Sequence, residues 1–212
     1  MINLYLIRHA ESIPNLASEQ FGGRLTGADI TQTGLEQSEN LGRRLASSGI
    51  MPNVVLTSPA KRARLTGLHA LQAAGLSIEL IIDDDLEEVS LGQWEGLGRK
   101  EIQTEALLKT ASKLGNDFKA PGGESVNDVI RRGRHLLTGF ERDYASGATI
   151  FAFTHGFFTR ALVGDLKGWD YQTIRDTPTP NTSITRLQID PLVNADWQVV
   201  SVGQKAWTGQ AA

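Results

Sequence analysis

Short apolar runs alternate along the chain with segments whose hydrophobic residues recur at helical spacing. The runs expected to form strands cover residues 3–9, 53–58, 77–82, 148–154, 183–189 and 197–202. Helices are expected at residues 33–48, 59–74, 99–114, 124–144 and from 155 to about 166, with a turn-rich loop at 83–98. Strands that alternate with helices form a mostly parallel sheet with both faces covered. The pattern therefore predicts an α/β fold, a three-layer αβα sandwich whose last two strands form a hairpin at one end of the sheet.

The composition is that of a globular protein. Of the 212 residues, 40% are hydrophobic and 21% are charged, which argues against disorder. The length suits one α/β domain with a substantial core, so residues 1–203 are expected to form a single domain and residues 204–212 a small polar tail. The chain contains no cysteine, which excludes disulfides, a cysteine nucleophile and cysteine-ligated metals.

Charge and hydropathy exclude two classes of partner. The formal net charge is −3 and there is no long basic run, so a nucleic-acid partner is not expected. No apolar run approaches the roughly 18 residues that a membrane span needs, and no membrane partner is expected. The apolar N-terminal run ends at Arg8 and His9. It lacks the charged region followed by an apolar region and a small-residue cleavage site that mark a signal peptide. A cytoplasmic location is therefore expected.

Candidate chemistry lies where the predicted parallel strands end, because ligands of open α/β sheets bind at the carboxyl ends of the strands. The residues at or just after these ends are Arg8 and His9, Thr57 and Ser58 with Arg62 and Arg64 on the following helix, Glu87 and Glu88, and Thr154, His155 and Gly156. One edge of the sheet is therefore expected to gather two histidines, several arginines and one or two carboxylates.

These residue types together favour phosphoryl transfer. Arginine binds phosphate oxygens bidentately and keeps its charge. The helix N-termini after Ser58 and Thr154 add backbone N–H donors for an anion. Neighbouring arginines lower the pKa of a histidine because a like charge disfavours the imidazolium, and a neutral imidazole is a nucleophile. The chemistry that this suggests is phosphoryl transfer through a phosphohistidine.

Other interpretations of the same residues are structural histidines, solvated surface carboxylates and a zinc site. His69 and His135 lie inside helical patterns and are assigned to structure, whereas His9 and His155 each follow an apolar strand. Zinc is disfavoured because clustered arginines repel a dication and the chain has no His-Glu-x-x-His spacing. No metal site is therefore expected.

Several motifs follow one another in a characteristic order. The first is Arg8-His9-Ala10-Glu11-Ser12 with Asn15 three residues further on, and the others lie at residues 30–37, 57–66, 86–96, 121–125, 154–156 and 181–184. In this order, over residues 1–202, they resemble the histidine phosphatase superfamily, also called the phosphoglycerate mutase-like family. Ala10 stands where the family usually has glycine, and the Arg-His pair is intact.

The resemblance implies a role for each matching residue. His9 would attack phosphorus, and Arg8, Arg62 and His155 would surround the phosphoryl oxygens. Asn15 and the backbone N–H of Gly156 would be additional donors. Glu88 would protonate the leaving oxygen and then deprotonate the attacking water. No metal or other cofactor would be required.

Two features bear on the branch of the family and on specificity. Around Glu88 the chain reads Leu-Glu-Glu-Val-Ser-Leu-Gly, where cofactor-dependent mutases carry Asn-Glu-Arg-His-Tyr-Gly and a longer insertion, so the chain resembles the phosphatase branch. Residues 97–120 are expected to form a helical cap over the active site. This segment carries more basic than acidic residues, which hints at a substrate with charge beyond its one phosphate, and Arg24 is a second candidate substrate contact.

The expected activity is hydrolysis of a small phosphate monoester by a metal-independent phosphoric monoester hydrolase. A cofactor-dependent phosphoglycerate mutase and a non-catalytic phosphate-binding protein on the same fold remain as alternatives. The substrate itself and a homodimeric assembly are left open by the sequence.

Overall fold

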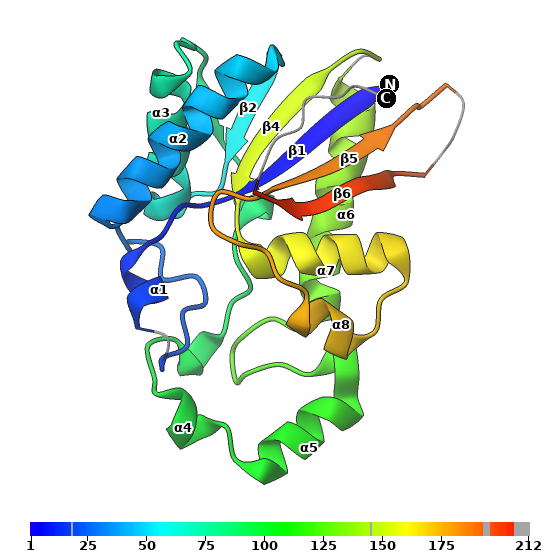
Figure 1. Cartoon of the computed structure of the whole chain (residues 1–212). Coiled ribbons are helices and arrows are strands. Elements are labelled where there is room, and N and C mark those ends of the chain that lie inside the picture. The colour runs from blue at the N-terminus through cyan, green and yellow to red at the C-terminus, as the bar shows by residue number, and fades with distance from the viewer. Residues whose placement is uncertain (18, 145, 193–195, 206–212) are drawn as a thin grey trace.

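A single mixed sheet organises the computed structural model, which describes residues 1–17, 19–144, 146–192 and 196–205. The described strands are β1 (Ile2–Arg8), β2 (Val54–Thr57), β3 (Leu80–Ile82), β4 (Thr149–Thr154), β5 (Ile184–Ile189) and β6 (Gln198–Gln204). They lie in the order β3-β2-β4-β1-β5-β6 (Figure 1). The first four strands of this order run parallel, and β5 and β6 add an antiparallel hairpin at one edge.

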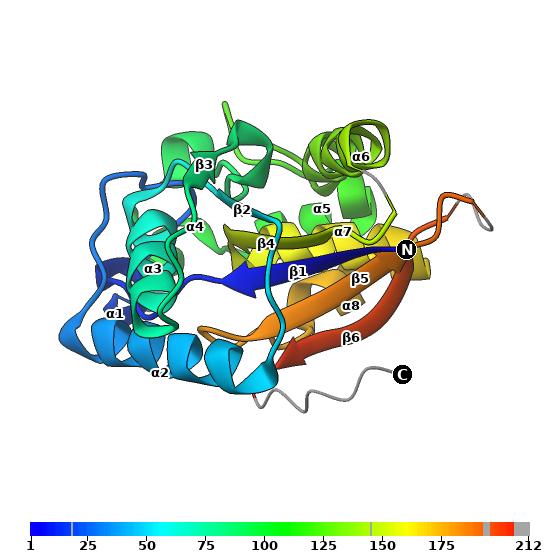
Figure 2. The ribbon, with the colours of Figure 1, turned by 90° about the horizontal axis from the view of Figure 1, so that it is seen from above.

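Helices cover both faces of the sheet. The long ones are α2 (Gln32–Ser48), α3 (Lys61–Ala73), α6 (Val126–Asp143) and α7 (Gly156–Lys167). On β1, Tyr5 and Ile7 pack into the core shared with α2 and α3, whereas Leu4 and Leu6 pack into the core shared with α6 and α7. Figure 2 shows the sheet between these two pairs of helices. This arrangement confirms the predicted three-layer α/β fold.

The strand register brings the predicted site residues to one edge. Arg8 pairs with Thr154 at the ends of β1 and β4, and the His9 N–H donates to the Thr154 carbonyl at 2.9 Å. On the other side of β4, the Ser58 N–H donates to the Phe153 carbonyl at 2.9 Å. The residues that follow β1, β2 and β4 therefore lie next to one another.

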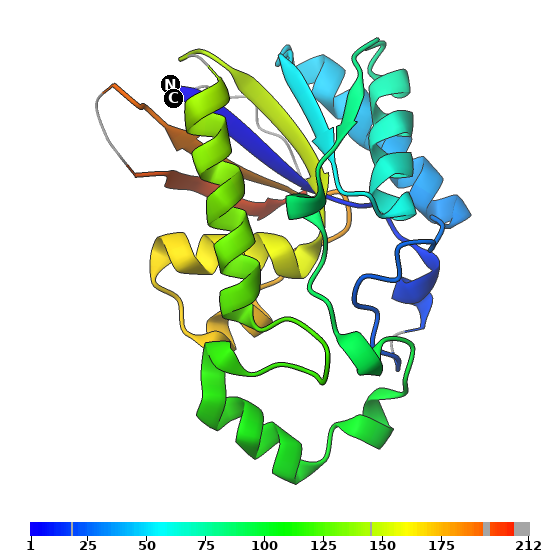
Figure 3. The ribbon, with the colours of Figure 1, turned by 180° about the vertical axis from the view of Figure 1, so that it is seen from behind.

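The predicted cap segment lies beyond this edge. It contains α4 (Arg99–Ile102), α5 (Glu105–Leu114) and a 3₁₀ turn at Gly115–Asp117. Figures 1 and 3 show α4 and α5 away from the sheet, at the end where the parallel strands terminate. In the part of the chain that the structure describes, no helix is long and apolar enough to cross a membrane.

Some predicted elements differ from those observed. The predicted helix at 99–114 is two helices, because Thr104 caps the N-terminus of α5 by accepting a hydrogen bond from the Leu107 N–H at 3.2 Å. The third strand covers only Leu80–Ile82, and the predicted loop at 83–98 contains 3₁₀ turns at Asp84–Leu86 and Gly92–Trp94. The short helices α1 (Ile13–Leu16) and α8 (Tyr171–Asp176) were not predicted. Of the predicted tail, Gln204 ends β6 and residues 206–212 lie outside the described residues.

Candidate active site

His9 lies immediately after β1 and is buried, with 4% of its surface exposed. Its Nδ1 is 2.7 Å from the carbonyl oxygen of Ala10. Because a carbonyl oxygen only accepts hydrogen bonds, Nδ1 carries the proton and Nε2 keeps its lone pair. Burial, and then the charges of Arg62 and Arg8, hold the pKa of His9 well below its usual value of 6.5. His9 is therefore a neutral imidazole with a basic nitrogen available.

Arg62, in the first turn of α3, connects the two histidines. Its Nε donates to His9 Nε2 at 3.3 Å, and its Nη2 donates to His155 Nδ1 at 3.2 Å. The rest of the guanidinium donates to the carbonyls of Gly23, Arg24 and Leu25 at 2.8–3.1 Å. Hydrogen bonds to a fixed loop hold this guanidinium in one orientation beside the His9 nitrogen.

His155 follows β4 and is fully buried. Since its Nδ1 accepts from Arg62, its Nε2 carries the proton and donates to Ser58 Oγ at 2.8 Å. The rings of His9 and His155 lie with their centroids 5.2 Å apart. Burial, and then the charge of Arg62, hold the pKa of His155 well below its usual value.

Glu88 points into the same space from the loop that follows β3. Its carboxylate accepts hydrogen bonds from the backbone N–H groups of Phe157 and Phe158 at 3.1 and 2.9 Å, and from its own neighbour Val89 at 3.0 Å. The first turn of α7 therefore holds the carboxylate in place, where the positive end of the helix dipole stabilises it. A carboxylate held in this way is oriented for proton exchange with a bound ester.

Glu87 turns away from Glu88 into a network of charged side chains. It pairs with Arg24 at 2.6 Å, and Arg24 also contacts Glu124 at 3.3 Å. Arg132, on α6, donates to Glu124 Oε1 at 3.1 Å and to the backbone carbonyls of Asp85, Glu87 and Glu88 at 2.7–3.2 Å. This network, named here the Arg132 clamp, fixes the backbone that carries Glu88.

Arg8 completes the cluster from the end of β1. Its Nη1 donates to the Thr179 carbonyl at 2.5 Å. Within the described residues its buried Nε has no hydrogen-bond partner, so it is available to an anion. Gly156 lies against it, and a Cβ on Gly156 would come within 3.2 Å of Arg8 Nε. Glycine at this position therefore leaves room for the guanidinium at the N-terminus of α7.

Asn15 is in the short helix α1 and lines the same cavity. Its side-chain oxygen accepts from the backbone N–H and the hydroxyl of Ser12, both at 3.0 Å. Asn181 donates to the same oxygen at 3.4 Å and to the His9 carbonyl at 2.9 Å. Because these contacts occupy the oxygen, the Asn15 amide nitrogen is the group left to donate to a ligand.

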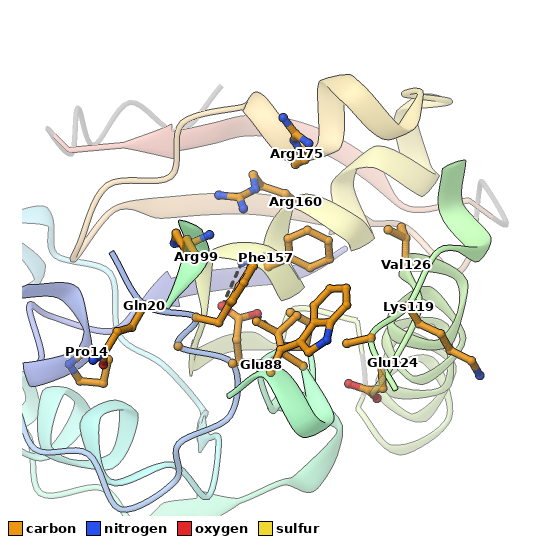
Figure 4. A pocket seen from close by; sticks show the side chains of 18 of the residues that line it. Pro14, Gln20, Glu88, Arg99, Lys119, Glu124, Val126, Phe157, Arg160 and Arg175 are labelled. Atoms are coloured by element: carbon orange, nitrogen blue, oxygen red, sulfur yellow. Dashed lines mark hydrogen bonds between the residues drawn. The ribbon is translucent and has the colours of Figure 1, made fainter. Parts of the chain in front are cut away.

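A cavity of about 660 Å³ contains the cluster. Its inner part is lined by Arg8, His9, Asn15, Arg62, Glu88 and Gly156. Its outer part is lined by aromatic and apolar residues of the cap and by further basic side chains, and Figure 4 shows Glu88, Phe157 and three of the arginines. A volume of this size is typical of pockets that hold drug-sized ligands.

The structure thus brings His9, His155, Arg8, Arg62, Glu88, Asn15 and Gly156 together at one edge of the sheet. It places Arg24 beside them, but the Arg24 guanidinium contacts Glu87 and Glu124. Substrate binding by Arg24 stays a prediction. Among the residues that the structure describes, no three carboxylate or histidine side chains gather as a metal-binding group.

Arg132 was not among the candidates from the sequence, and Ser58 was one only for its place at a strand end, with no role as a partner of His155. Ser58, which accepts from His155, stands directly after a strand, as His9 does, and that position was a signal. Arg132 lies three residues after Val129 and four before Leu136, both of which are buried. The helical phase of these neighbours indicates that Arg132 faces inward, unlike the adjacent Arg131, whose side chain is 74% exposed.

Comparison with known proteins points to one family. A family model described as the histidine phosphatase superfamily (branch 1) matches residues 4–204. The chain is 31% identical over 205 residues to a 2,3-bisphosphoglycerate-dependent phosphoglycerate mutase of Methylobacterium radiotolerans, and the match covers 93% of this chain and 92% of the relative.

Solved structures of similar fold include YhfR of Bacillus stearothermophilus, with a TM-score of 0.81 and 26% identity, covering 97% of this chain and 98% of that one. A mycobacterial glucosyl-3-phosphoglycerate phosphatase matches with a TM-score of 0.78 and 22% identity, covering 95% of this chain and 98% of that one. At 22% identity, the likeness to the mycobacterial phosphatase concerns the fold alone.

Proposed function

The chain belongs to the histidine phosphatase superfamily (branch 1), and from this premise we propose that it hydrolyses a small phosphate monoester through a phosphohistidine on His9. The observation that carries the proposal is the state of His9. Its Nδ1 proton is held by the Ala10 carbonyl, its pKa is lowered by burial and by two arginines, and its Nε2 faces the Arg62 guanidinium. This combination provides a neutral nucleophile where a phosphoryl group would be bound.

In the first step, Arg62 Nε releases His9 Nε2 as it turns to the phosphoryl group. The freed Nε2 lone pair attacks phosphorus, and the bond between phosphorus and the ester oxygen breaks. Arg8 and Arg62 bind the phosphoryl oxygens and stabilise the charge that spreads over them in the transition state. His155 takes part through the proton on Nε2 that it now donates to Ser58, or, in the other tautomer, through a proton on Nδ1 once the bond from Arg62 is broken. Glu88 in its protonated form gives the departing alkoxide its proton and is left as the carboxylate that the N–H groups of α7 hold.

In the second step, water attacks the phosphohistidine and the bond between phosphorus and nitrogen breaks. Glu88, now a carboxylate, takes the proton of the water, and inorganic phosphate leaves. The same side chain thus acts as acid and then as base, which requires that it stay in one place through both steps. The hydrogen bonds from Phe157 and Phe158 to its carboxylate, and the Arg132 clamp on its backbone, support that requirement.

A second candidate function is phosphoglycerate mutase activity, which the names of the relatives favour. The match spans 92% of the Methylobacterium relative, so chain length does not separate the two functions. Both would begin with transfer of a phosphoryl group to His9. They differ in whether water or the bound intermediate next receives the phosphoryl group.

The proposal is tested with p-nitrophenyl phosphate and a panel of phosphorylated metabolites. We expect steady release of inorganic phosphate and an acid-labile, base-stable label on His9 when turnover of a labelled ester is quenched. His9→Ala should abolish both, whereas His69→Ala, on a helix away from the cavity, should retain them. Label on a serine or an aspartate, or normal turnover by His9→Ala, would contradict the proposal.

A further inference from the structure

The outer part of the cavity combines cationic and aromatic walls that the proposed reaction does not use. Arg99, Arg160 and Arg175 come from α4, α7 and α8, and all three line the cavity together with Arg8 and Arg62. Figure 4 shows Arg160 and Arg175 above Phe157 in the view and Glu88 and Glu124 below it. If Arg8 and Arg62 bind the transferred phosphoryl group, Arg160 and Arg175 lie where they can bind another part of the substrate.

Arg160 is the innermost of these cations. Its Nη1 donates to Thr179 Oγ1 at 3.1 Å, and its guanidinium carbon lies 5.4 Å from the Phe157 ring centre. Within the described residues, its buried Nε has no hydrogen-bond partner. Burial lowers the pKa of Arg160, while the nearby carboxylates Glu88 and Asp176 act in the opposite direction. A buried guanidinium with an unused donor is a good site for an anion.

The carboxylates near these arginines are already engaged. Glu88 accepts three backbone hydrogen bonds, and Glu124 is bound by Arg132 and Arg24. Asp176 is 3.5 Å from Arg175 but does not line the cavity, and its side chain is 59% exposed. The outer part of the cavity is therefore positively charged on the side of α7 and α8.

The opposite wall is apolar and partly aromatic. Trp94 lies between Phe21 and Phe118, with ring centres 5.6 and 6.0 Å away. Leu107, Leu108 and Ala111 of α5 extend the same wall. Such a wall stabilises a flat or apolar group by burying it. A ligand with only a short polar chain would leave the wall exposed to water.

We propose, building on the function proposed above, that the substrate's leaving group carries a flat apolar portion and a second anionic group. The apolar portion would pack against Trp94 and the cap, and the second anion, a carboxylate or a phosphate, would bind Arg160 and Arg175. The reacting phosphate and this second anion occupy the two cationic parts of one cavity. The expected substrate is therefore an elongated phosphate ester that carries a second anionic group and is larger than a phosphorylated three-carbon acid.

Binding of stable phosphonates tests the inference without requiring turnover. The native chain is titrated calorimetrically with 4-carboxybenzylphosphonate and with the uncharged isostere 4-carbamoylbenzylphosphonate. We expect the carboxylate to bind about tenfold more tightly, the effect of one or two charge-assisted hydrogen bonds. 1,4-Xylylene bisphosphonate is a third probe, and its affinity relative to the carboxylate shows which anion the site prefers.

Variants locate the second anion. The Arg175→Gln variant lies on a surface helix and should fold normally. We expect it to reduce the preference for the carboxylate over its carbamoyl isostere several-fold. The double variant Arg160→Gln/Arg175→Gln should abolish this preference. Arg43→Gln, an exposed arginine of α2, is the matched control and should leave the preference intact. 3-Phosphonopropionate, which has both charges but no ring, should bind more weakly than the aromatic dianion.

Three results would overturn the inference: equal affinity for the carboxylate and its carbamoyl isostere, a preference unchanged in both arginine variants, or tighter binding of the ringless dianion. The last would identify a short glycerate-like occupant. Failure of the proposed function gives a different result, because a chain that binds these phosphonates selectively but releases no phosphate from any ester would contradict hydrolysis alone.

Discussion

At the scale of single residues, the two buried histidines couple the site to the stability of the fold. The pKa values of His9 and His155 are held well below 6.5 in the folded chain, mainly by burial. Between the folded and unfolded pKa values, the unfolded chain binds protons that the folded chain does not. The free energy of unfolding therefore rises with pH in that window and falls as the pH drops below 6.5.

We predict that acid destabilises the protein with a slope of up to about 1.4 kcal/mol per pH unit for each histidine below pH 6.5. Urea unfolding at pH 7.5, 6.5, 6.0 and 5.5 measures the slope. His155→Asn should reduce the slope by about one histidine's share, and His69→Asn is the control. A free energy of unfolding that stays constant to pH 5.5 in the native chain would show that the histidines titrate normally.

The adjacent carboxylates Glu87 and Glu88 have separate tasks. Glu88 lines the cavity and is held by α7, whereas Glu87 contacts Arg24. We predict that Glu88→Gln slows hydrolysis of an alkyl phosphate by about 10²-fold or more, since general acid catalysis contributes on this order. Hydrolysis of p-nitrophenyl phosphate should slow much less, because its leaving group needs no proton. Equal losses on both esters, or a larger loss in Glu87→Gln, would reverse the assignment.

At the scale of elements, α6 determines where Glu88 lies through one side chain. The Arg132 side chain is 12% exposed and donates to Glu124 and to three backbone carbonyls of the Glu88 loop, so its loss removes a charged donor from each of them. We predict that Arg132→Met lowers the free energy of unfolding by about 3 kcal/mol. It should also lower kcat on an alkyl phosphate more than on p-nitrophenyl phosphate, as Glu88→Gln does.

Arg131→Met is the matched control for that variant. Arg131 is the next residue of the same helix, but it is exposed and contacts only Asp128, so its loss should cost less than about 1 kcal/mol. The two variants are compared by denaturant unfolding and by the ratio of rates on the two esters. Similar losses in both variants, or an unchanged ratio in Arg132→Met, would remove the positioning role from Arg132.

Close packing between α2 and α3 gives a second prediction at this scale. A Cβ on Gly42 would lie 2.2 Å from the Ala70 carbonyl oxygen, whereas a Cβ on Gly139 of α6 would meet nothing within 4 Å. Gly42→Ala should therefore destabilise the fold by about 1–3 kcal/mol through overpacking. Gly139→Ala should stabilise it by up to about 1 kcal/mol through helix propensity. Urea midpoints measure both, and the same sign for the two variants would contradict this account.

Particular elements show how far the sequence could be interpreted. Residues 148–154 predicted a buried strand because every position is apolar or small, and β4 lies in the middle of the sheet. The break between α4 and α5 was missed because a single capping threonine decides it, and periodicity does not report one hydrogen bond. The helices α1 and α8 have four and six residues, too few to show a period.

In the site, too, some features could be predicted from the sequence and others could not. His9 and His155 could be found because strand ends converge. Their hydrogen bonds to the Ala10 carbonyl and to the Ser58 hydroxyl could not, because no sequence pattern reports which ring nitrogen meets which partner. Arg24, which follows Phe21-Gly22-Gly23, was a candidate substrate contact from the sequence. Its actual contacts with Glu87 and Glu124 depend on loops that meet only in three dimensions.

At the scale of the whole molecule, the sheet and the cap contribute different parts of the activity. The histidines and Arg8 lie at the ends of β1 and β4, and Arg62 lies in the first turn of α3 after β2, so the hydrogen bonds of these strands fix their positions. The cap provides Arg99, Phe118 and the apolar side chains of α5 to the lining of the same cavity, next to Phe21 and Trp94. Under the proposed function, the sheet edge would carry out the reaction, and the cap with α7 and α8 would select the ester.

The size of the cavity bears on whether water or a bound intermediate receives the phosphoryl group from His9, and we predict that water does. A mutase must keep water from its phosphohistidine. Meanwhile the dephosphorylated intermediate must stay bound and reorient, so that its other hydroxyl can receive the phosphoryl group. A glycerate intermediate is small for a cavity of about 660 Å³, and each water needs only about 30 Å³ of it. Water should therefore reach the phosphohistidine. With 3-phosphoglycerate and a bisphosphoglycerate primer, we expect little 2-phosphoglycerate and steady release of phosphate, measured by coupled assays. The p-nitrophenyl phosphatase activity should need no primer. Primer-dependent isomerisation with negligible phosphate release would instead show that the cap closes on the intermediate and excludes water.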